Sequence, residues 1–482
     1  MDELPPPKVI PDMGIPLGYS LEHEHRKAPM GFCYSPQKSS DQHKELESIL
    51  HTGNGHLMTI APTGSGKGVS CIIPTLLHYP GSVIVIDPKG ENFAVTAEYR
   101  RSIGQEVLLF DPFGATDHQT NQFNPLQLIK NAEDDRQYDL ANELASLLIP
   151  RTDSQNPFFD DMAKSLLTGL ILYVTDESYP GALSTLAEIR HLLFQPQNEV
   201  IAMANLMAKS TKPVLIETAQ IYLMTEPKVL ASVLSTAQSH LTKFRGAQLD
   251  RQMAGNDLDA EKVISGAPLS IYLVIPPDKL LTYQELLRVW VGNIFNLILQ
   301  RRSQQDNNTL FILDEAAQLG ELEALRQAIT LLRGYGLQTW SFWQDLSQLK
   351  RLYSDWKTLM NNCRVHQVFG ITNLMMAQES AQIYNIWTAE ELLELDSDEL
   401  ILQIAGDLPV ISQKINYLTD PAFQKKAKTN PYYSKEPNFK PRYKQRNHNR
   451  SDNRNINHEG LPDEGLRIPS FIDFIQKDKN NT

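Results

Sequence analysis

The sequence predicts an α/β protein with a doubly wound, mainly parallel sheet that carries an inserted all-α domain. Short apolar runs alternate with helical patterns, as buried parallel strands do, and they lie at 57–60, 82–86, 106–110, 269–275, 309–313 and 338–342. From roughly 126 to 262 the apolar residues recur only at helical spacing, for example at 140, 144, 147 and 148. An insertion of helices into one sheet domain accounts for both patterns.

The composition is that of an ordinary soluble globular protein. The chain has 482 residues, of which 41% are apolar and 21% charged, so its length suggests two to four domains. Its three cysteines, Cys33, Cys71 and Cys363, lie far apart, which argues against a disulfide framework or a zinc site and fits a reducing cytoplasm. We find no signal peptide and no apolar run of about 18 residues, and we expect no membrane span.

The alternation of patterns also predicts where the domains lie. We expect an N-terminal arm packed on the core at 1–54, a first part of the sheet domain at 55–125, the all-α insertion at 126–262, the second part of the sheet domain at 263–420, and a basic, disordered tail at 421–482. The tail ends in an apolar segment, Phe471–Ile475, which is either a docking peptide or folds back on its own domain.

Charge is distributed unevenly along the chain. Between Lys425 and Arg454 there are ten Lys and Arg residues but only two acidic residues, which gives a local charge of +8. Since the net charge of the whole chain is −12, all other residues together carry −20. An acidic body does not wrap DNA over a broad surface, although DNA can still pass through a narrow basic channel. The basic tail is either a contact for DNA, anionic lipid or a protein platform, or simply solvated.

The stretch Ala61-Pro-Thr-Gly-Ser-Gly-Lys-Gly68 has the features of a phosphate-binding loop. It follows the apolar run 57–60 and precedes an amphipathic segment at 69–77, so strand, glycine-rich turn and helix come in the required order. Backbone N–H groups, the helix N-terminus and the Lys67 ammonium would all face one oxyanion. The match is imperfect because Ala61 replaces the first glycine, and Gly68 replaces the hydroxyl that normally holds magnesium.

A second motif follows the apolar run 309–313, which ends in Asp314-Glu315. In nucleotide-hydrolysing folds a strand of this kind carries an Asp that positions magnesium and often a Glu that activates the attacking water. The alternative is that the two acids only cap the next helix. Together with the loop at Lys67, the pair predicts a site that binds and hydrolyses a nucleotide.

At this point the chain resembles the type IV secretion and conjugative transfer coupling proteins of the TraG/TrwB type, between about 57 and 418. Six blocks carry the resemblance: Ala61–Val69 with Ile73–Leu76, Asp87–Asn92, Phe159–Asp161 with Ser165–Leu167, Leu313–Glu315 with Leu319–Gly320, Arg333–Gly336 with Gln344–Leu349, and Asn361–Cys363. The resemblance implies a RecA-like P-loop NTPase core that uses ATP and Mg²⁺, and a homohexamer with nucleotide between subunits. Glycine after the loop lysine is usual in this family.

The resemblance implies a role for each site residue. Phosphate would be bound by Lys67 and the loop backbone, namely Thr63, Gly64, Ser65, Gly66, Gly68 and Val69. Asp314 would position magnesium through water, and Glu315 would orient the hydrolytic water. Gln344 resembles the sensor of the γ-phosphate; alternatively, it is a strand-end amide that satisfies loop backbone. Arg333 is the candidate arginine finger for a neighbouring subunit, or else a helix C-terminal arginine that complements the dipole.

Other positions near the site allow more than one interpretation. Lys89 or Glu91, in the motif that begins at Asp87, either contacts nucleotide, signals to the pore or forms a simple turn with an ion pair. Ser70 could replace the hydroxyl missing at Gly68, but it comes two residues late and is expected to face neighbouring structure.

The function that the resemblance implies is that of an ATP-driven coupling protein. It would recruit a DNA–relaxase complex to a type IV secretion channel, contact the channel ATPases and inner-membrane components, and help to move single-stranded DNA. The alternatives are an ATPase that recruits protein effectors and a slowly hydrolysing, nucleotide-gated adaptor. Family members usually have N-terminal transmembrane helices, for which the loop at residue 61 leaves no room. We therefore expect a cytoplasmic chain, attached to the inner membrane through partners and monomeric in isolation, or a trimmed form.

Overall fold

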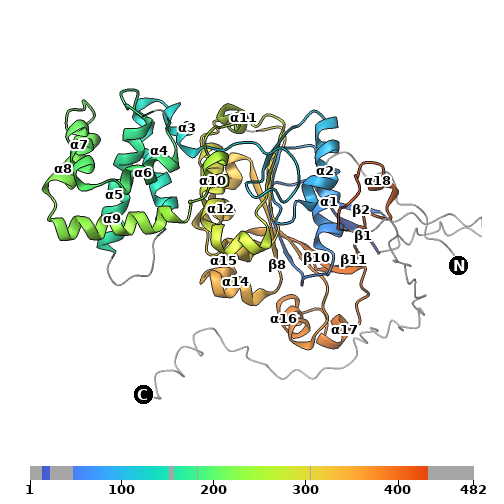
Figure 1. Ribbon diagram of the computed structural model, residues 1–482. Helices are drawn as coiled ribbons and strands as arrows, with labels where there is room; N and C mark the ends of the chain where they lie inside the picture. The colour runs from blue at the N-terminus through green and yellow to red at the C-terminus, as the bar shows by residue number, and fades with distance from the viewer. Residues whose placement is uncertain (1–13, 22–46, 151–156, 182, 304, 433–482) are drawn as a thin grey trace, which may run out of the picture. The chain divides into compact units, whose positions relative to one another are not determined.

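The computed structural model describes residues 14–21, 47–150, 157–181, 183–303 and 305–432 (Figure 1). In this part of the chain eleven strands form one sheet in the order β2-β1-β11-β10-β9-β3-β8-β7-β4-β6-β5. The strands are β1 (Ile15–Ser20), β2 (Ser48–His51), β3 (His56–Ile60), β4 (Val83–Ile86), β5 (Glu106–Phe110), β6 (Leu269–Leu273), β7 (Thr309–Leu313), β8 (Leu337–Trp343), β9 (Cys363–Val368), β10 (Glu399–Ile404) and β11 (Val410–Gln413).

Seven neighbouring strands, from β9 to β5 in the sheet order, pair in parallel, while β10, β11, β1 and β2 continue the sheet with antiparallel pairs. The predicted α/β class with a mainly parallel sheet is confirmed. All six predicted strands are present with bounds that agree to within two residues. The strands β1, β2, β9, β10 and β11 were not predicted.

The sheet buries both of its faces. On β4, Ile84 and Ile86 belong to one apolar cluster, whereas Val83 and Val85 belong to the other, as the alternation of a strand requires. The second cluster also contains side chains of three helical elements: the π-helix η1 (Gly68–Ile72), the helix α1 (Ile73–Leu76) that continues it, and α2 (Glu91–Ser102). The first includes α12 (Pro277–Ile298). Helices on both faces make the sheet doubly wound.

Between β5 and β6 every described element is a helix. These helices are α3 (Pro125–Lys130), α4 (Asp134–Leu148), α5 (Phe158–Thr175), α6 (Leu186–Leu193), α7 (Gln197–Met207), α8 (Pro213–Met224), α9 (Pro227–Thr242), α10 (Ala247–Gln252) and α11 (Ala260–Ser265). Helix α5 contacts α4, α8 and α9, and its side chains from Leu166 to Thr175 are buried. The boundaries of a separate all-α domain at 126 and 262 remain a prediction.

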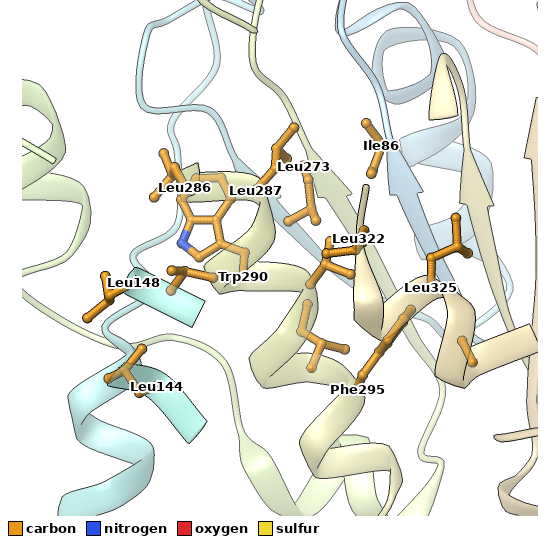
Figure 2. Close-up of a cluster of buried hydrophobic side chains, with 14 of the residues drawn as sticks. Ile86, Leu144, Leu148, Leu273, Leu286, Leu287, Trp290, Phe295, Leu322 and Leu325 are labelled. Atoms are coloured by element: carbon orange, nitrogen blue, oxygen red, sulfur yellow. The ribbon is translucent and has the colours of Figure 1, made fainter. Parts of the chain in front are cut away.

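Helix α12 joins these helices to the sheet. Its Trp290, which is fully buried, lies beside Leu144 and Leu148 of α4 in Figure 2. On the same helix Phe295 packs edge-to-face against Phe311 of β7, with ring centroids 5.0 Å apart. Burying such large aromatic side chains contributes about 3 kcal/mol each to stability. One apolar cluster therefore runs from the helical insertion into the sheet core.

The remaining helices follow β7. They are η2 (Ala316–Leu319), α13 (Glu323–Leu331), η3 (Leu332–Tyr335), α14 (Leu346–Leu352), α15 (Trp356–Asn362), α16 (Leu374–Tyr384), α17 (Ala389–Leu393) and α18 (Pro421–Gln424). Within the described ranges, no helix combines the length and the apolar character that crossing a bilayer requires.

One expectation about the chain's organisation needs correction. The disordered tail was placed too early, because residues up to 432 are ordered on the core: Phe423 of α18 is fully buried, and the Lys428 N–H donates to the Val95 carbonyl at 3.0 Å. Residues 433–482, with the apolar segment Phe471–Ile475, lie outside the described residues. At the other end, β1 and β2 extend the sheet, while 1–13 and 22–46 lie outside the description.

The segment 69–77 was expected to be amphipathic, but in the structure it is buried on nearly every side. From Ser70 to Leu77 each side chain is less than a tenth exposed. The reason is that Ile73 and Leu77 pack against Ile415 and Tyr417, which follow the last strand. No local sequence pattern indicated that this distant segment would cover the helix.

Candidate functional site

The predicted site residues gather where parallel strands end. In the sheet, β3, β8, β7 and β4 are consecutive neighbours. The loop 61–68 follows β3, Gln344 follows β8, Asp314 follows β7 and Asp87 follows β4. Because parallel strands end at the same edge, these residues come together although they are far apart in sequence. Ligands of open α/β sheets bind at this edge.

The loop after β3 has the conformation of an anion cradle. The Ala61 N–H donates to the Trp343 carbonyl at 2.8 Å, which ties the loop to β8, and the Ser70 N–H donates to Gly66 at 2.8 Å, which begins the helix. Gly64 and Gly66 have φ angles of +79° and +95°, a region that other residues rarely adopt. Successive N–H groups in such a turn before a helix point toward one anion.

Lys67 and Gln344 both bind the carboxylate of Glu315. The Lys67 Nζ lies 3.1 Å from Glu315 Oε1, and the Gln344 Nε2 donates to Oε2 at 2.8 Å. The Lys67 side chain is only 8% exposed. Glu315 itself has a φ of +61°, an uncommon backbone conformation for a glutamate, of the kind that concentrates at functional sites. The structure thus joins three of the predicted catalytic residues in one chain of contacts.

Two further carboxyl groups lie at the same edge. Asp87 is buried and accepts hydrogen bonds from the Phe93 N–H at 2.8 Å and from the Asn92 amide at 3.2 Å. Burial raises the pKa of Asp87 to about 7, and burial likewise raises the pKa of Asp314 to about 7 although the Lys67 charge opposes it. Among the described residues Asp314 has no hydrogen-bond donor. An unpaired carboxyl group in this position suits a cation such as Mg²⁺.

Glu91 borders the phosphate loop at Gly68. A Cβ atom placed on Gly68 would meet a single group within 4 Å, the Glu91 Oε1, at 4.0 Å. Glu91 is the first residue of α2, and its Oε1 accepts a hydrogen bond from the Asn430 amide at 2.6 Å. The sequence motif at Asp87 indicated Glu91 as one of two candidates, but nothing in the sequence indicated Asn430.

Lys414 is a site residue that the sequence analysis missed. Its Nζ donates to the Ser65 carbonyl of the phosphate loop at 2.9 Å and lies 4.8 Å from the centre of the Phe369 ring. Burial lowers the pKa of Lys414. A single lysine after an unpredicted strand carries no sequence signal, because only the folded sheet brings β11 beside the loop.

Arg333 lies elsewhere. It belongs to η3, which precedes β8, so the length of β8, about 20 Å for seven residues, separates it from Gln344. Its guanidinium donates to Asn54 Oδ1 at 2.6 and 2.9 Å. The pKa of His56, at the start of β3, is lowered mainly by burial and in addition by the positive charge of Arg333. Arg333 therefore faces away from the cluster of its own chain.

The other predicted phosphate-binding residues differ in exposure. Thr63 and Gly64 are exposed at the tip of the loop, and Ser65 and Gly68 are half-buried. The Val69 carbonyl accepts from the Tyr417 N–H at 3.4 Å. Ser70, the possible substitute hydroxyl, is buried, and its Oγ lies 3.5 Å from where a Gly66 Cβ would be, so it lies beside the loop at Gly66.

Comparison with known families gives one match that covers most of the chain. The model of the family described as "Type IV secretory system Conjugative DNA transfer" matches residues 35–382. The matched range includes the loop at 61–68, Glu91, Glu315, Arg333 and Gln344 but not Lys414.

Curated relatives agree with this match. The chain is 27% identical over 364 residues to the conjugal transfer protein TraG of Escherichia coli, and 28% identical over 403 residues to protein VirD4 of Agrobacterium fabrum. These alignments cover 71% and 76% of this chain but only 57% and 59% of the relatives. The chain thus spans little more than half the length of the curated relatives it matches.

Solved structures show the same fold. The bacterial conjugative coupling protein TrwBdeltaN70 in its unbound form has a TM-score of 0.59 at 16% identity, over 78% of this chain and 89% of that one. The plasmid coupling protein TrwB in complex with ADP and Mg²⁺ has a TM-score of 0.58 at 16% identity, over 78% and 90%. At this identity the likeness concerns the fold alone, and it confirms the predicted RecA-like α/β core.

Proposed function

The chain belongs to the type IV secretory system conjugative DNA transfer family, and we propose that it is an ATP-driven coupling protein that engages a DNA–relaxase complex and helps to move single-stranded DNA into a secretion channel. The observation that carries the proposal is the contact of Lys67 and Gln344 with Glu315 beside a glycine-rich loop. Such a set binds phosphate and activates water, which is the chemistry of a nucleotide-driven motor.

The residues divide the work of hydrolysis among them. The loop N–H groups and the Lys67 ammonium bind the β- and γ-phosphates. As Lys67 turns to the phosphate, it leaves the Glu315 carboxylate, which then accepts a hydrogen bond from the attacking water and orients it. Gln344 already donates to the same carboxylate at 2.8 Å, so it connects the position of the Glu315 carboxylate to the end of β8.

Magnesium fits the carboxyl groups at this edge. Asp314 has no hydrogen-bond donor among the described residues, and its position after β7, next to the loop, suits a magnesium ion held through water. When bound with the nucleotide, the ion neutralises part of the phosphate charge. Lys67 and the loop would then share the remaining charge.

The position of Arg333 favours assembly into a ring, and we propose a homohexamer as the active form. Because it lies at the opposite end of β8 from Gln344, it cannot reach the phosphate of its own chain. It can reach a site on a neighbouring subunit when the amino edge of one sheet faces the carboxyl edge of the next. An arginine supplied in this way stabilises transition-state charge and contributes roughly three orders of magnitude in rate.

The helical insertion is the proposed cargo-facing part. Large apolar side chains are exposed on it, among them Phe194, Leu206, Leu223 and Met224, which is 80% exposed. Side chains of this kind concentrate at protein contact sites. The channel's own ATPases and inner-membrane components are the proposed partners that hold the chain at the cytoplasmic face. A second candidate is the same motor acting on protein effectors, and a third is a slowly hydrolysing adaptor, which Ala61 and Gly68 favour.

Stimulation of ATP turnover separates these candidates. Steady-state hydrolysis is measured with the full chain alone, with single-stranded DNA, and with double-stranded DNA of the same sequence as the control. A motor that moves single-stranded DNA turns over faster when that DNA is present. Turnover that no DNA changes favours protein cargo, whereas ATP binding with negligible turnover in every condition favours the adaptor.

A further inference from the structure

Gly68 and Glu91 occupy complementary positions at the phosphate loop. In most loops of this type the residue after the lysine is Ser or Thr, and its hydroxyl binds magnesium. Here that residue is Gly68, and a Cβ on it would point into open space bounded by one group alone, the Glu91 Oε1 at 4.0 Å. An oxygen atom from another element therefore lies 4.0 Å from the point where a side chain at position 68 would begin.

The position of Glu91 is fixed by the structure around it. Gly90, just before it, has a φ of +67°, and a Cβ there would come within 2.3 Å of the Thr116 side chain. On the other side the buried Asn430 donates to Glu91 Oε1 at 2.6 Å and to the Tyr417 hydroxyl at 2.9 Å. The carboxylate is thus held beside the loop rather than free to turn into solvent.

Glu91 and Asp314 are two acidic groups near the phosphate loop, and the Lys67 and Lys89 charges act on Asp314 as well. Among the described residues neither Glu91 nor Asp314 forms an ion pair, and the negative charge of Glu91 is one of those that oppose ionisation of Asp314. The nearby Lys67 is already paired with Glu315. Phosphate groups in the loop would add further negative charge to the same place. Two carboxylates and phosphate oxygens together are the set that Mg²⁺ prefers, whereas without the ion they repel one another.

We propose that Glu91 takes the place of the missing hydroxyl and, with Asp314, holds the magnesium that accompanies the nucleotide. The inference rests on the proposed function, since it concerns the same site. It also accounts for the glycine at position 68, because a hydroxyl is dispensable where a carboxylate on α2 already faces the ion. Asn430, from the segment after β11, then acts as a positioning residue for Glu91.

Equilibrium binding of ATP, with magnesium and with a chelator, tests this assignment on the full chain. Glu91→Gln removes the charge but keeps an acceptor for Asn430, and Glu98→Gln, on an exposed face of α2 where Glu98 pairs with Lys428, is the matched control. We expect Glu91→Gln to lower the enhancement of ATP binding by magnesium on the order of 10- to 100-fold. The same variant binds magnesium-free ATP more tightly, because one repulsive charge is gone. A purely structural role would not produce this opposite effect.

A second substitution makes the test specific. Gly68 is the first residue of η1 and has no group closer than 4.0 Å to a new Cβ, so Gly68→Ser is tolerated and returns a hydroxyl to the loop. In the Glu91→Gln background, this substitution restores the enhancement of ATP binding by magnesium. It also restores the affinity of the nucleotide complex for Mn²⁺, which electron paramagnetic resonance measures. Thermal unfolding without nucleotide verifies that each variant is folded.

Three results would overturn the proposal. The first is an unchanged magnesium enhancement in folded Glu91→Gln, which would remove Glu91 from the ion. The second is a loss that Gly68→Ser does not restore, because Glu91 would then only hold the loop in shape. The third is an unsubstituted chain that binds no ATP in either condition, which contradicts the proposed function and the inference with it.

Discussion

The ammonium of Lys67 lies 3.1 Å from the carboxylate of Glu315, although 248 positions separate the two residues in the chain. Lys67 is the proposed phosphate-binding lysine, and Glu315 is the residue proposed to orient water, and the two pair with each other in this structure. Under this proposal, a phosphate that binds the loop has to compete with Glu315 for Lys67. The proposal therefore couples nucleotide binding to the release of the Glu315 carboxylate.

Glu315→Gln separates binding from hydrolysis. The amide keeps the shape of the side chain but neither attracts Lys67 nor accepts a proton, so ATP binding persists or tightens while turnover falls on the order of 10²–10⁴-fold. Equilibrium binding and single-turnover hydrolysis measure the two effects. Glu321→Gln, whose carboxylate pairs with Arg326 on the surface, is the control. Equal losses of binding and turnover would mean that Glu315 only shapes the loop.

Arg333→Ala lowers turnover only in the assembled ring. The side chain is remote from its own nucleotide site, so ATP binding to isolated subunits is unchanged, whereas turnover in the oligomer falls by about 10³-fold. Asn54→Ala removes the local partner of Arg333 without removing the guanidinium and is the matched control. Light scattering gives the oligomeric state beside each rate. A confirmed oligomer of Arg333→Ala with normal turnover rules out the finger.

Lys414→Met weakens ATP binding by roughly tenfold, about 1.4 kcal/mol, because it removes the hydrogen bond to the Ser65 carbonyl and a cation next to the phosphate loop. Methionine fills a similar volume, so the thermal stability of the nucleotide-free chain is kept. Lys426→Met deletes a comparable bond, to the Leu77 carbonyl at 3.1 Å, away from the loop and serves as the control. Calorimetric titration with ATP compares the three proteins. Equal affinities would assign Lys414 to structure alone.

Asp87 makes stability depend on pH. Burial raises its pKa from 3.8 to about 7, so between these values the folded chain keeps a proton that the unfolded chain has released. The contribution of Asp87 to the free energy of unfolding is consequently greatest below about pH 4 and declines as the pH rises through 7. Asp87→Asn cannot ionise, and we expect its melting temperature to fall less between mildly acidic and mildly basic buffers. Parallel melting profiles for the two proteins would contradict this cause.

Local patterns predicted most of the parallel sheet. Buried runs such as 309–313 are strongly apolar and end in residues with chemical roles, so strand and site were visible together. The antiparallel strands were missed for a physical reason. In β10 and β11 apolar and polar residues mix over only six and four positions, and their burial depends on pairing with β9 and β1.

The site was predicted in part, because only some of its members belong to motifs. Glycine-rich spacing indicated Lys67, a strand end indicated Glu315, and the family resemblance indicated Gln344; the structure brings all three into contact. Lys414 and Asn430 come from a segment that the sequence analysis placed at the border of the tail. Long-range packing of that segment on η1 and α2 positions them, and no local spacing encodes it.

Steady-state ATP hydrolysis by the full chain and by Lys67→Ala is the first test of whether the loop and Glu315 form a hydrolytic site. We expect turnover in the unsubstituted chain and a loss on the order of 10²–10³-fold in the variant, since one positive group at the phosphate is gone. The variant keeps its melting temperature to within a few degrees, because the buried lysine pairs with the Glu315 carboxylate rather than packing in the apolar core. Turnover that survives Lys67→Ala in a folded protein would show that this loop does not drive hydrolysis.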